Sequence, residues 1–231
     1  MSGDASPEGL AANYKLSGDG VELLLHGGAF VVEERGSASE TMLYSGQTAL
    51  KLGLGGKDYL LLGGTVYAYD NLAGYEPLGA DPGKGYGNSL VDAPGDENET
   101  KLYAGDYLLL EGFAQAGVAL GKIPLTLSLQ YLVNNQADAD DKAYLGSVAA
   151  RLPGGVRLGY QYRYLEKDAT LGVFGESTDF GNGTDLKGHI PYLSLDIGRN
   201  FSVKLQYASG QKGLADGRDI KTFKCDISAK F

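Results

Sequence analysis

The chain has 231 residues, a formal net charge of -9 and a pI near 4.7, and this acidity argues against a nucleic-acid partner because phosphates demand clustered Lys and Arg. Its 36 Gly and 16 Tyr, with no Trp and only 2 Met, are typical of strands and turns rather than of packed helices. A mean hydropathy of -0.18, with no window near the roughly 18 continuous apolar residues of a spanning helix, excludes a helical membrane protein, and the length fits one domain over residues 1–231.

The compartment has to be inferred from the body of the chain. The first residues, MSGDASPEG, have neither a basic region nor an apolar core, so we expect a secretory signal to be absent or already removed. Cys225 is the single cysteine, which excludes a disulfide framework and a paired-cysteine metal site. We interpret it as a small apolar residue on one face of a strand.

Segments in which apolar and polar residues alternate recur along the whole chain. This period of two is that of a strand whose two faces meet different solvents. Most of the segments are close to the roughly 9–11 residues that a tilted strand needs to cross a bilayer. The eleven predicted strands are Leu10–Leu16, Val21–Glu34, Thr41–Leu54, Tyr59–Asp70, Asp106–Leu120, Pro124–Asn134, Ala143–Leu152, Val156–Glu166, Gly188–Ile197, Phe201–Ser209 and Asp219–Phe231.

The connections between these segments alternate strictly between tight and long. The tight ones, such as SGDG at 17–20, are rich in Gly, Asn or Asp and short enough for hairpin turns. The long ones are polar, and the longest covers residues 71–105. Turns at one end and loops at the other are typical of a transmembrane barrel. The sequence therefore predicts an all-β fold, a transmembrane antiparallel up-and-down β-barrel with about 11–12 visible strands.

Each segment separates its polar side chains from its apolar ones. In VRLGYQYRYLE, the even-numbered positions 156–164 are Val, Leu or Tyr, whereas positions 157, 161 and 163 are Arg or Gln. We expect the polar set to face a water-filled lumen and the apolar set to face lipid. The tyrosines expected in the interfacial aromatic girdle are Tyr44, Tyr69, Tyr131, Tyr164 and Tyr207. The predicted pore-lining residues are Arg157, Gln161, Arg163, Lys204, Gln206, Lys224, Asp226, Glu111 and Gln130.

The number of predicted strands is odd, whereas single-chain bacterial barrels have an even number with both ends on one side. If the last strand, DIKTFKCDISAKF, ends in the periplasm, the first strand starts outside. An open sheet edge is too costly in hydrocarbon, so the barrel must be closed. We therefore expect the chain to be the carboxyl-terminal part of a larger barrel of about 16 strands, or to close in an unusual way.

The carboxyl-terminal half resembles a known family. The segment DYLLLEGFAQAGVALGKIPLTLSLQYLVNNQADADDKAYLGSV, the blocks YQYRYLEKDA and DFGNGTDLKGH, and the closing strand are similar to the putative porin family of outer-membrane β-barrels, with the best agreement over residues 106–231. The resemblance implies an outer-membrane channel in a Gram-negative bacterium. It also implies that Phe231 is the terminal aromatic that the barrel-assembly machinery reads as an insertion signal, and that family members extend further at the amino end.

The insert at 71–105 is too long for an ordinary connection, so we expect it to be functional, folded or disordered. Our leading hypothesis is that it folds into the pore as a constriction loop, and that its deletion raises conductance. The alternative is a disordered external flap. The residues that it would contribute to a constriction are Glu76, Asp81, Asp92, Asp96, Glu97 and Glu99.

Candidate chemistry is sparse. His26 and His189 are the only histidines, and no HExxH, GxSxG or paired-His spacing accompanies them, so we expect no catalytic residue, no cofactor and no enzyme activity. Asp138, Asp140 and Asp141 could hold a hard cation such as calcium, but they lack the glycine and distal Glu of a calcium loop. A solvated acidic loop is the favoured interpretation, and FGNGTD lacks the GK[ST] of a phosphate-binding loop.

These observations predict a passive diffusion channel for small hydrophilic solutes or ions. Its wall mixes both charges but leans cationic, whereas its loops are acidic, so we expect weak charge selectivity. The expected partners are outer-membrane lipid, the barrel-assembly machinery and small hydrophilic solutes, and a homo-oligomer is left open. A non-conducting scaffold or adhesin that binds through its external loops is the alternative function. A soluble β-sandwich or lectin-like module is opposed by the turn asymmetry.

Overall fold

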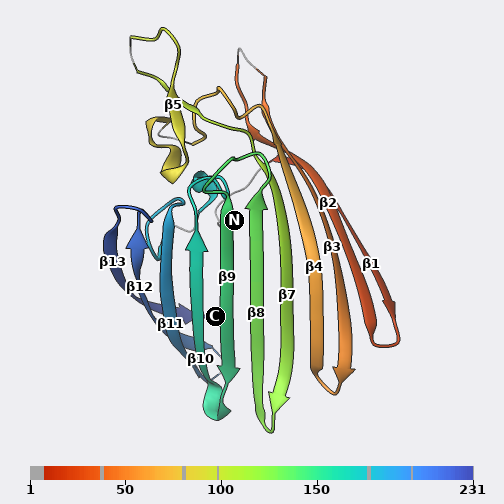
Figure 1. The fold of residues 1–231 in the computed structure, drawn as a ribbon. Helices are drawn as coiled ribbons and strands as arrows, with labels where there is room; N and C mark the ends of the chain where they lie inside the picture. Colours follow the sequence, from red (N-terminus) through yellow and green to blue (C-terminus); the bar gives the residue numbers. More distant parts are fainter. Residues whose placement is uncertain are drawn as a thin grey trace.

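The computed structural model of the chain describes residues 8–36, 39–79, 82–97, 99–175, 178–198 and 200–230. Eleven strands form one antiparallel sheet in which each strand pairs with its neighbours along the chain, and two short strands form a separate hairpin (Figure 1). The expected all-β, up-and-down architecture is therefore confirmed. No helix within the described residues is long and apolar enough to cross a membrane.

The strands of the main sheet follow the predicted segments to within a few residues. Most are 10–13 residues long, because the alternating pattern continues through each of them without interruption. They are β1 (Glu8–Gly18), β2 (Val21–Glu33), β3 (Thr41–Gly55), β4 (Asp58–Asp70), β7 (Leu108–Leu120), β8 (Ile123–Asn134), β9 (Lys142–Arg151), β10 (Val156–Leu165), β11 (Leu186–Ile197), β12 (Phe201–Lys212) and β13 (Arg218–Ala229). The separate hairpin consists of β5 (Leu90–Asp92) and β6 (Lys101–Tyr103), and 3₁₀ turns occur at η1 (Pro82–Gly87), η2 (Pro153–Gly155) and η3 (Gly172–Phe174).

Short and long connections lie at opposite ends of the sheet, as predicted (Figure 1). Tight turns join β1 to β2, β3 to β4, β7 to β8, β9 to β10 and β11 to β12. Longer segments join β2 to β3, β4 to β7, β8 to β9, β10 to β11 and β12 to β13. The sheet therefore has a turn end and a loop end, and each of its faces runs between them.

The pairing register divides the side chains into two faces. Arg157 lies opposite Ser194, Ser194 opposite Lys204, and Lys204 opposite Asp226, so these residues share one face, which we call the inner face. The other side, the outer face, carries the exposed large apolar side chains, with Leu129 and Ile227 exposed by 65% and 73%. They include Leu10, Tyr14, Leu16, Tyr44, Leu50, Leu62, Val66, Leu110, Leu127, Leu129, Tyr131, Leu158, Tyr160, Leu193, Leu195, Phe201, Leu205, Tyr207, Phe223 and Ile227. So continuous an apolar surface marks a membrane or protein contact rather than a face in water.

The sheet is curved and open, with β1 and β13 as its two edges (Figure 1). Within the described residues, β1 pairs only with β2, and β13 pairs only with β12. Because the sheet is antiparallel throughout and holds eleven strands, β1 and β13 run in the same direction. Direct pairing of the two edges would therefore place one parallel ladder in an otherwise antiparallel sheet.

The buried apolar side chains gather at the loop end. The insert between β4 and β7 contributes Leu72, Leu78 and Tyr103, and the connection between β10 and β11 contributes Leu171, to a cluster that also includes Leu109 of β7. We call the described residues of the β4–β7, β8–β9 and β10–β11 connections the cap. The insert is thus a folded part of the structure, and the cap shares a hydrophobic core with strands of the sheet.

Candidate pore wall

The predicted pore-lining residues lie together on the inner face. Gln206 pairs with Lys224, Lys204 pairs with Asp226, and Gln130 pairs with Leu145, which in turn pairs with Arg163. Gln161 lies two residues from Arg163 on the same strand, and Glu111 lies opposite Leu132 on the face of Gln130. These polar and charged side chains share the inner face with buried apolar residues under the cap, such as Leu43 and Leu109, whereas the outer face carries the exposed large apolar side chains.

Opposite charges on the inner face compensate one another. Arg157 donates to Asp196 at 2.7 Å, and both side chains remain about two-fifths exposed. On β2, Glu22 lies 3.1 Å from the Lys15 ammonium and 3.7 Å from that of Lys51. Exposed pairs of this kind contribute at most about 1 kcal/mol each to stability, so their main effect is on the local electric field. Positive and negative groups therefore lie next to one another along these parts of the wall.

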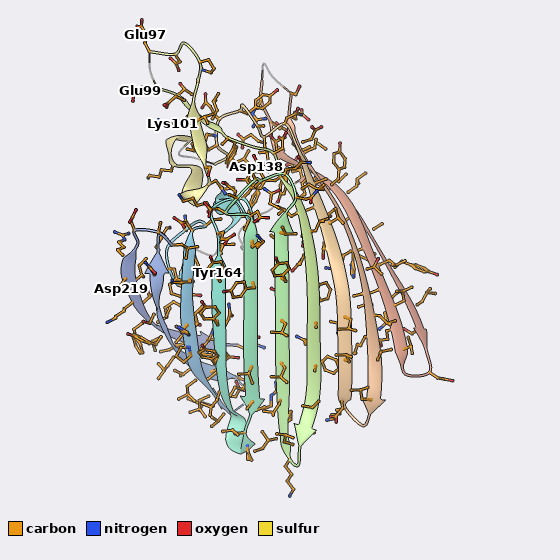
Figure 2. All side chains as sticks on the ribbon, viewed as in Figure 1. Glu97, Glu99, Lys101, Asp138, Tyr164 and Asp219 are labelled. Carbon is orange, nitrogen blue, oxygen red and sulfur yellow. The ribbon has the colours of Figure 1, made fainter. Side chains whose placement is uncertain are left out.

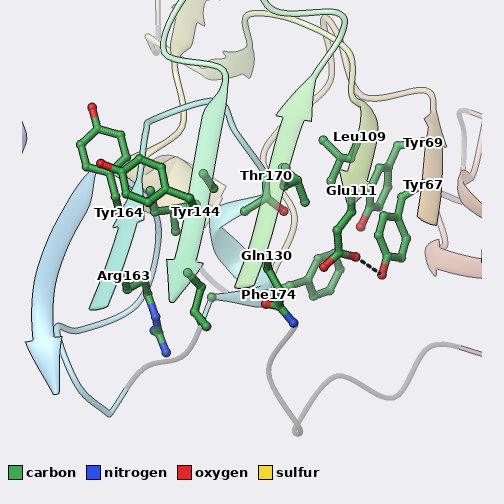
Figure 3. A pocket seen from close by; sticks show the side chains of 15 residues that line it. Tyr67, Tyr69, Leu109, Glu111, Gln130, Tyr144, Arg163, Tyr164, Thr170 and Phe174 are labelled. Atoms are coloured by element: carbon green, nitrogen blue, oxygen red, sulfur yellow. Dashed lines mark hydrogen bonds between the residues drawn. The ribbon is translucent and has the colours of Figure 1, made fainter. Parts of the chain in front are cut away.

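A cavity of about 310 Å³ opens on the inner face below the cap (Figure 3). Glu111 and Gln130 of the sheet line it together with Thr170 and Phe174 of the β10–β11 connection, and Tyr67 donates to the Glu111 carboxylate at 3.4 Å. A loop side chain thus lies over the wall at this level. The cavity combines a carboxylate, an amide and aromatic rings, a set that suits polar solutes.

Residues 130–231 match the family model of the putative porins. The match runs from β8 to the end of the chain, and it confirms over this part the resemblance expected from the sequence. It supports a porin-like outer-membrane function in general terms, and a channel rather than an enzyme. No curated protein and no solved structure matches the chain.

The acidic residues at the tip of the insert, Glu97 and Glu99, lie away from the inner face of the sheet. Glu97 and Glu99 are exposed on the loop of the β5–β6 hairpin, which projects beyond the loop end of the sheet (Figure 2). Asp92 on the same hairpin is exposed and forms an ion pair with Lys101. Of the other residues predicted for a constriction, Glu76 is exposed, Asp96 is half-buried, and Asp81 lies outside the described residues. The loop side chains over the cavity come instead from the β10–β11 connection.

Asp179 of that connection also reaches the wall, although no alternating pattern in the sequence predicts it there. Its carboxylate accepts from Gln206 Nε2 at 2.5 Å and from Lys224 Nζ at 2.5 Å, and it lies 3.9 Å from the Arg163 guanidinium. Only 7% of its side chain is exposed. Its neighbour Phe180 is also buried. Three residues predicted to line the pore are therefore joined by one loop carboxylate.

Two buried asparagines hold the cap together. Asn88 of the insert donates to the carbonyls of Lys167 and Thr170, both at 2.7 Å, and accepts from the Gly172 amide at 2.7 Å. Asn134, at the end of β8, donates to the Asp168 carbonyl at 2.9 Å and accepts from the Leu108 amide at 3.1 Å. These contacts join segments that are far apart in the sequence, and they fix the β10–β11 connection over the wall.

Buried tyrosines complete the cap. Burial raises the pKa of Tyr103 to about 12, and burial together with the Asp168 carboxylate raises the pKa of Tyr107 above its usual range. The Tyr107 hydroxyl donates to Asp168 at 3.0 Å, and the Tyr103 hydroxyl accepts from the Leu78 amide at 3.3 Å. Both phenols are therefore neutral at physiological pH and act as structural hydrogen-bonding groups.

The two histidines lie on opposite faces of the sheet. His26 is on the inner face, and its Nδ1 lies 2.6 Å from the Asn13 amide oxygen. His189 is on the outer face, where its Nδ1 lies 2.6 Å from the Tyr160 hydroxyl. Although Asp179 is close to His189 in sequence, it lies on the inner side. The described residues hold no group of three His, Cys, Asp or Glu side chains that could bind a metal ion, and Phe231 lies outside them.

Proposed function

We propose that the chain forms the wall of an outer-membrane porin, a passive diffusion channel for small hydrophilic solutes or ions with weak charge selectivity. The observation that carries this proposal is the division of one sheet into an apolar outer face and a charged inner face. Lipid would cover the outer face, and water and solute would meet the inner one. The family match over residues 130–231 supports the same function.

The weak selectivity follows from the pairing of charges along the wall. Arg157 is paired with Asp196, Lys204 lies opposite Asp226, and Glu22 lies between the two cations Lys15 and Lys51. An ion passing such a wall meets alternating signs at short range rather than a ring of one charge. The channel should therefore discriminate by size more than by charge.

The two free edges of the sheet, β1 and β13, limit the ways in which the channel can close. A closed antiparallel ring needs an even number of strands, whereas this sheet has eleven. An odd number of further strands, inserted between β13 and β1, would complete it with antiparallel pairs throughout. If a second copy lay in the membrane in the same orientation, its edge strands would run parallel to the edges that they would have to pair with. We therefore propose a larger barrel rather than closure by a second copy.

Single-channel conductance in a planar bilayer is the test of the proposed function. Reproducible current steps are expected from the closed barrel that this chain forms together with the further strands between β13 and β1. Membrane-inserted, folded material that never conducts would contradict the proposal and favour the second candidate, a scaffold or adhesin. That candidate is favoured by the folded cap over the wall and by the exposed, projecting β5–β6 hairpin (Figure 2).

Neutralising Arg157 and Arg163 together should shift the reversal potential in a salt gradient toward cation selectivity. Both guanidinium groups lie on the inner face, and their loss leaves Asp196 and Asp179 with fewer compensating charges. The matched control is neutralisation of Lys101 and Lys187, which removes the same charge from the projecting hairpin and from the outer face. An equal shift in both double variants would refute a role for the two arginines in the wall.

A further inference from the structure

The Asp179 carboxylate is surrounded by donors in the way that a bound anion would be. Gln206 and Lys224 occupy directly opposed positions on β12 and β13, and both direct a donor at the same carboxylate oxygen, Oδ1. Arg163 of β10 approaches the second oxygen, Oδ2, at 3.9 Å. An amide, an ammonium and a guanidinium therefore converge on one carboxylate from three strands of the wall. Charge-assisted hydrogen bonds of this kind are the strong ones in proteins.

The strands alone would leave this site without an anion. Gln206 is buried, with 5% of its surface exposed, and the Arg163 and Lys224 side chains are only 20% and 23% exposed. Two partly buried cations that face one another destabilise the wall unless a negative group lies between them. Among the described residues, the carboxylate that these two cations contact comes from a loop, whereas Arg157 is paired with Asp196 on the neighbouring strand.

The loop is seated by shape as well as by charge. The Phe180 ring rests on two glycines of the wall, and a Cβ at Gly188 or Gly210 would lie 2.3 Å or 2.8 Å from a ring carbon. The ring packs with Ile190 and Ala208 in a small buried cluster. The absence of side chains at these glycines makes room for the loop, and it leaves open space on the wall beside the three donors when the loop is away.

We propose that Arg163, Gln206 and Lys224 form an anion site on the channel wall that binds the carboxylate of a small organic solute, and that Asp179 is the intramolecular ligand that competes for it. The proposal rests on the proposed function. It deepens that function by naming monocarboxylates as the solutes that the wall can bind. Asp179 holds the affinity for them low, which keeps the channel weakly selective.

Isothermal titration of sodium benzoate into the folded, detergent-solubilised chain tests this without requiring conduction. Asp179→Asn keeps the shape of the side chain but removes its charge, so the benzoate carboxylate no longer competes with an internal one. We expect benzoate to bind this variant at least about tenfold more tightly than it binds the unaltered chain. The reason is that the benzoate carboxylate then receives the charge-assisted hydrogen bonds that Asp179 accepts in the unaltered chain. Affinity equal to that of the unaltered chain would overturn the proposal.

Two further comparisons locate the site. Asp196→Asn also removes one negative charge from the inner face, but it frees only Arg157 from its ion pair and none of the three proposed donors. This variant should leave the affinity for benzoate unchanged. In the Asp179→Asn background, Lys224→Gln should abolish the gain, whereas Lys221→Gln, on the outer face of the same strand, should preserve it. An equal gain in Asp196→Asn, or no loss in Lys224→Gln, would show that general charge and not this site binds the anion.

The Phe180→Leu variant provides a second route if Asp179→Asn does not fold. It keeps every charge but loosens the contact of the ring with Gly188 and Gly210, so Asp179 leaves the site more often. Benzoate affinity should then rise by a smaller factor, and an unchanged affinity would contradict the proposal. Binding without channel conductance would refute the proposed function while supporting the anion site, and conductance without binding would do the reverse.

Discussion

A single methyl group added at Gly183 is expected to open the cap. An ideal Cβ at this position would lie 1.9 Å from the Tyr86 carbonyl oxygen, which is a backbone atom and cannot rotate away. Gly183 also has a φ of 107°, where side chains other than glycine are strained. The steric and conformational costs of Gly183→Ala together come to about 3 kcal/mol. Amide exchange at Thr184, which donates to the Tyr86 carbonyl at 2.9 Å, measures this loss directly.

Gly181 is the matched control for this prediction. It also has a positive φ, of 78°, but an added Cβ would meet nothing closer than the Lys212 ammonium at 3.7 Å. Gly181→Ala should therefore cost only the conformational part, about 1 kcal/mol. Similar exchange rates at Thr184 in the two variants would mean that the close approach of Tyr86 and Gly183 does not hold the cap in place.

The main sheet could be predicted from the sequence because its strands are determined locally. The segment predicted at Val21–Glu34 is the strand Val21–Glu33, and that predicted at Tyr59–Asp70 is Asp58–Asp70. Successive side chains of such a strand point alternately into two different environments, so apolar and polar residues alternate along its whole length. The two faces can therefore be assigned without knowing which strands pair with it. Glycine-rich turns then determine the order, because each tight turn forces the next strand to pair with the last.

The cap could not be predicted, because its contacts connect distant parts of the chain. The hairpin strands Leu90–Asp92 and Lys101–Tyr103 are three residues each, too short to show a period. Asn88 meets Lys167 and Thr170 across about eighty residues of sequence, and an asparagine in a polar loop carries no sign of such a role. The insert was recognised as special only by its length.

The wall was predicted more fully than the loop that covers it. Arg163, Gln206 and Lys224 were assigned to the inner face by alternation alone, and the register confirms their common face. Asp179 has no such pattern, since it lies in an irregular segment where period-two reasoning does not apply. Electrostatics alone indicates that the two cations Arg163 and Lys224 need a negative partner. Which loop residue supplies the carboxylate depends on the fold and cannot be read from the sequence.

Replacing Asn88 by alanine should release the β10–β11 connection from the insert. Three hydrogen bonds of 2.7 Å are lost, and their carbonyl and amide partners are left buried without them. At about 1 kcal/mol for each bond, local opening becomes roughly 100-fold more frequent. Because this connection places Phe174 over the cavity and Asp179 on the wall, the proposed pore should show larger and noisier single-channel currents.

Ser89→Ala separates this effect from a general disturbance of the insert. Ser89 uses its backbone amide to donate to Asp168 at 2.9 Å and its carbonyl to accept from Ala104 at 3.1 Å, and alanine keeps both. Its currents should equal those of the unaltered chain. Quiet, unchanged currents in Asn88→Ala, together with fast amide exchange at Thr184, would show that the cap opens without affecting passage. The constriction would then lie in the wall itself, because the loop that carries Asp179 would be free to move while the pore stayed the same width.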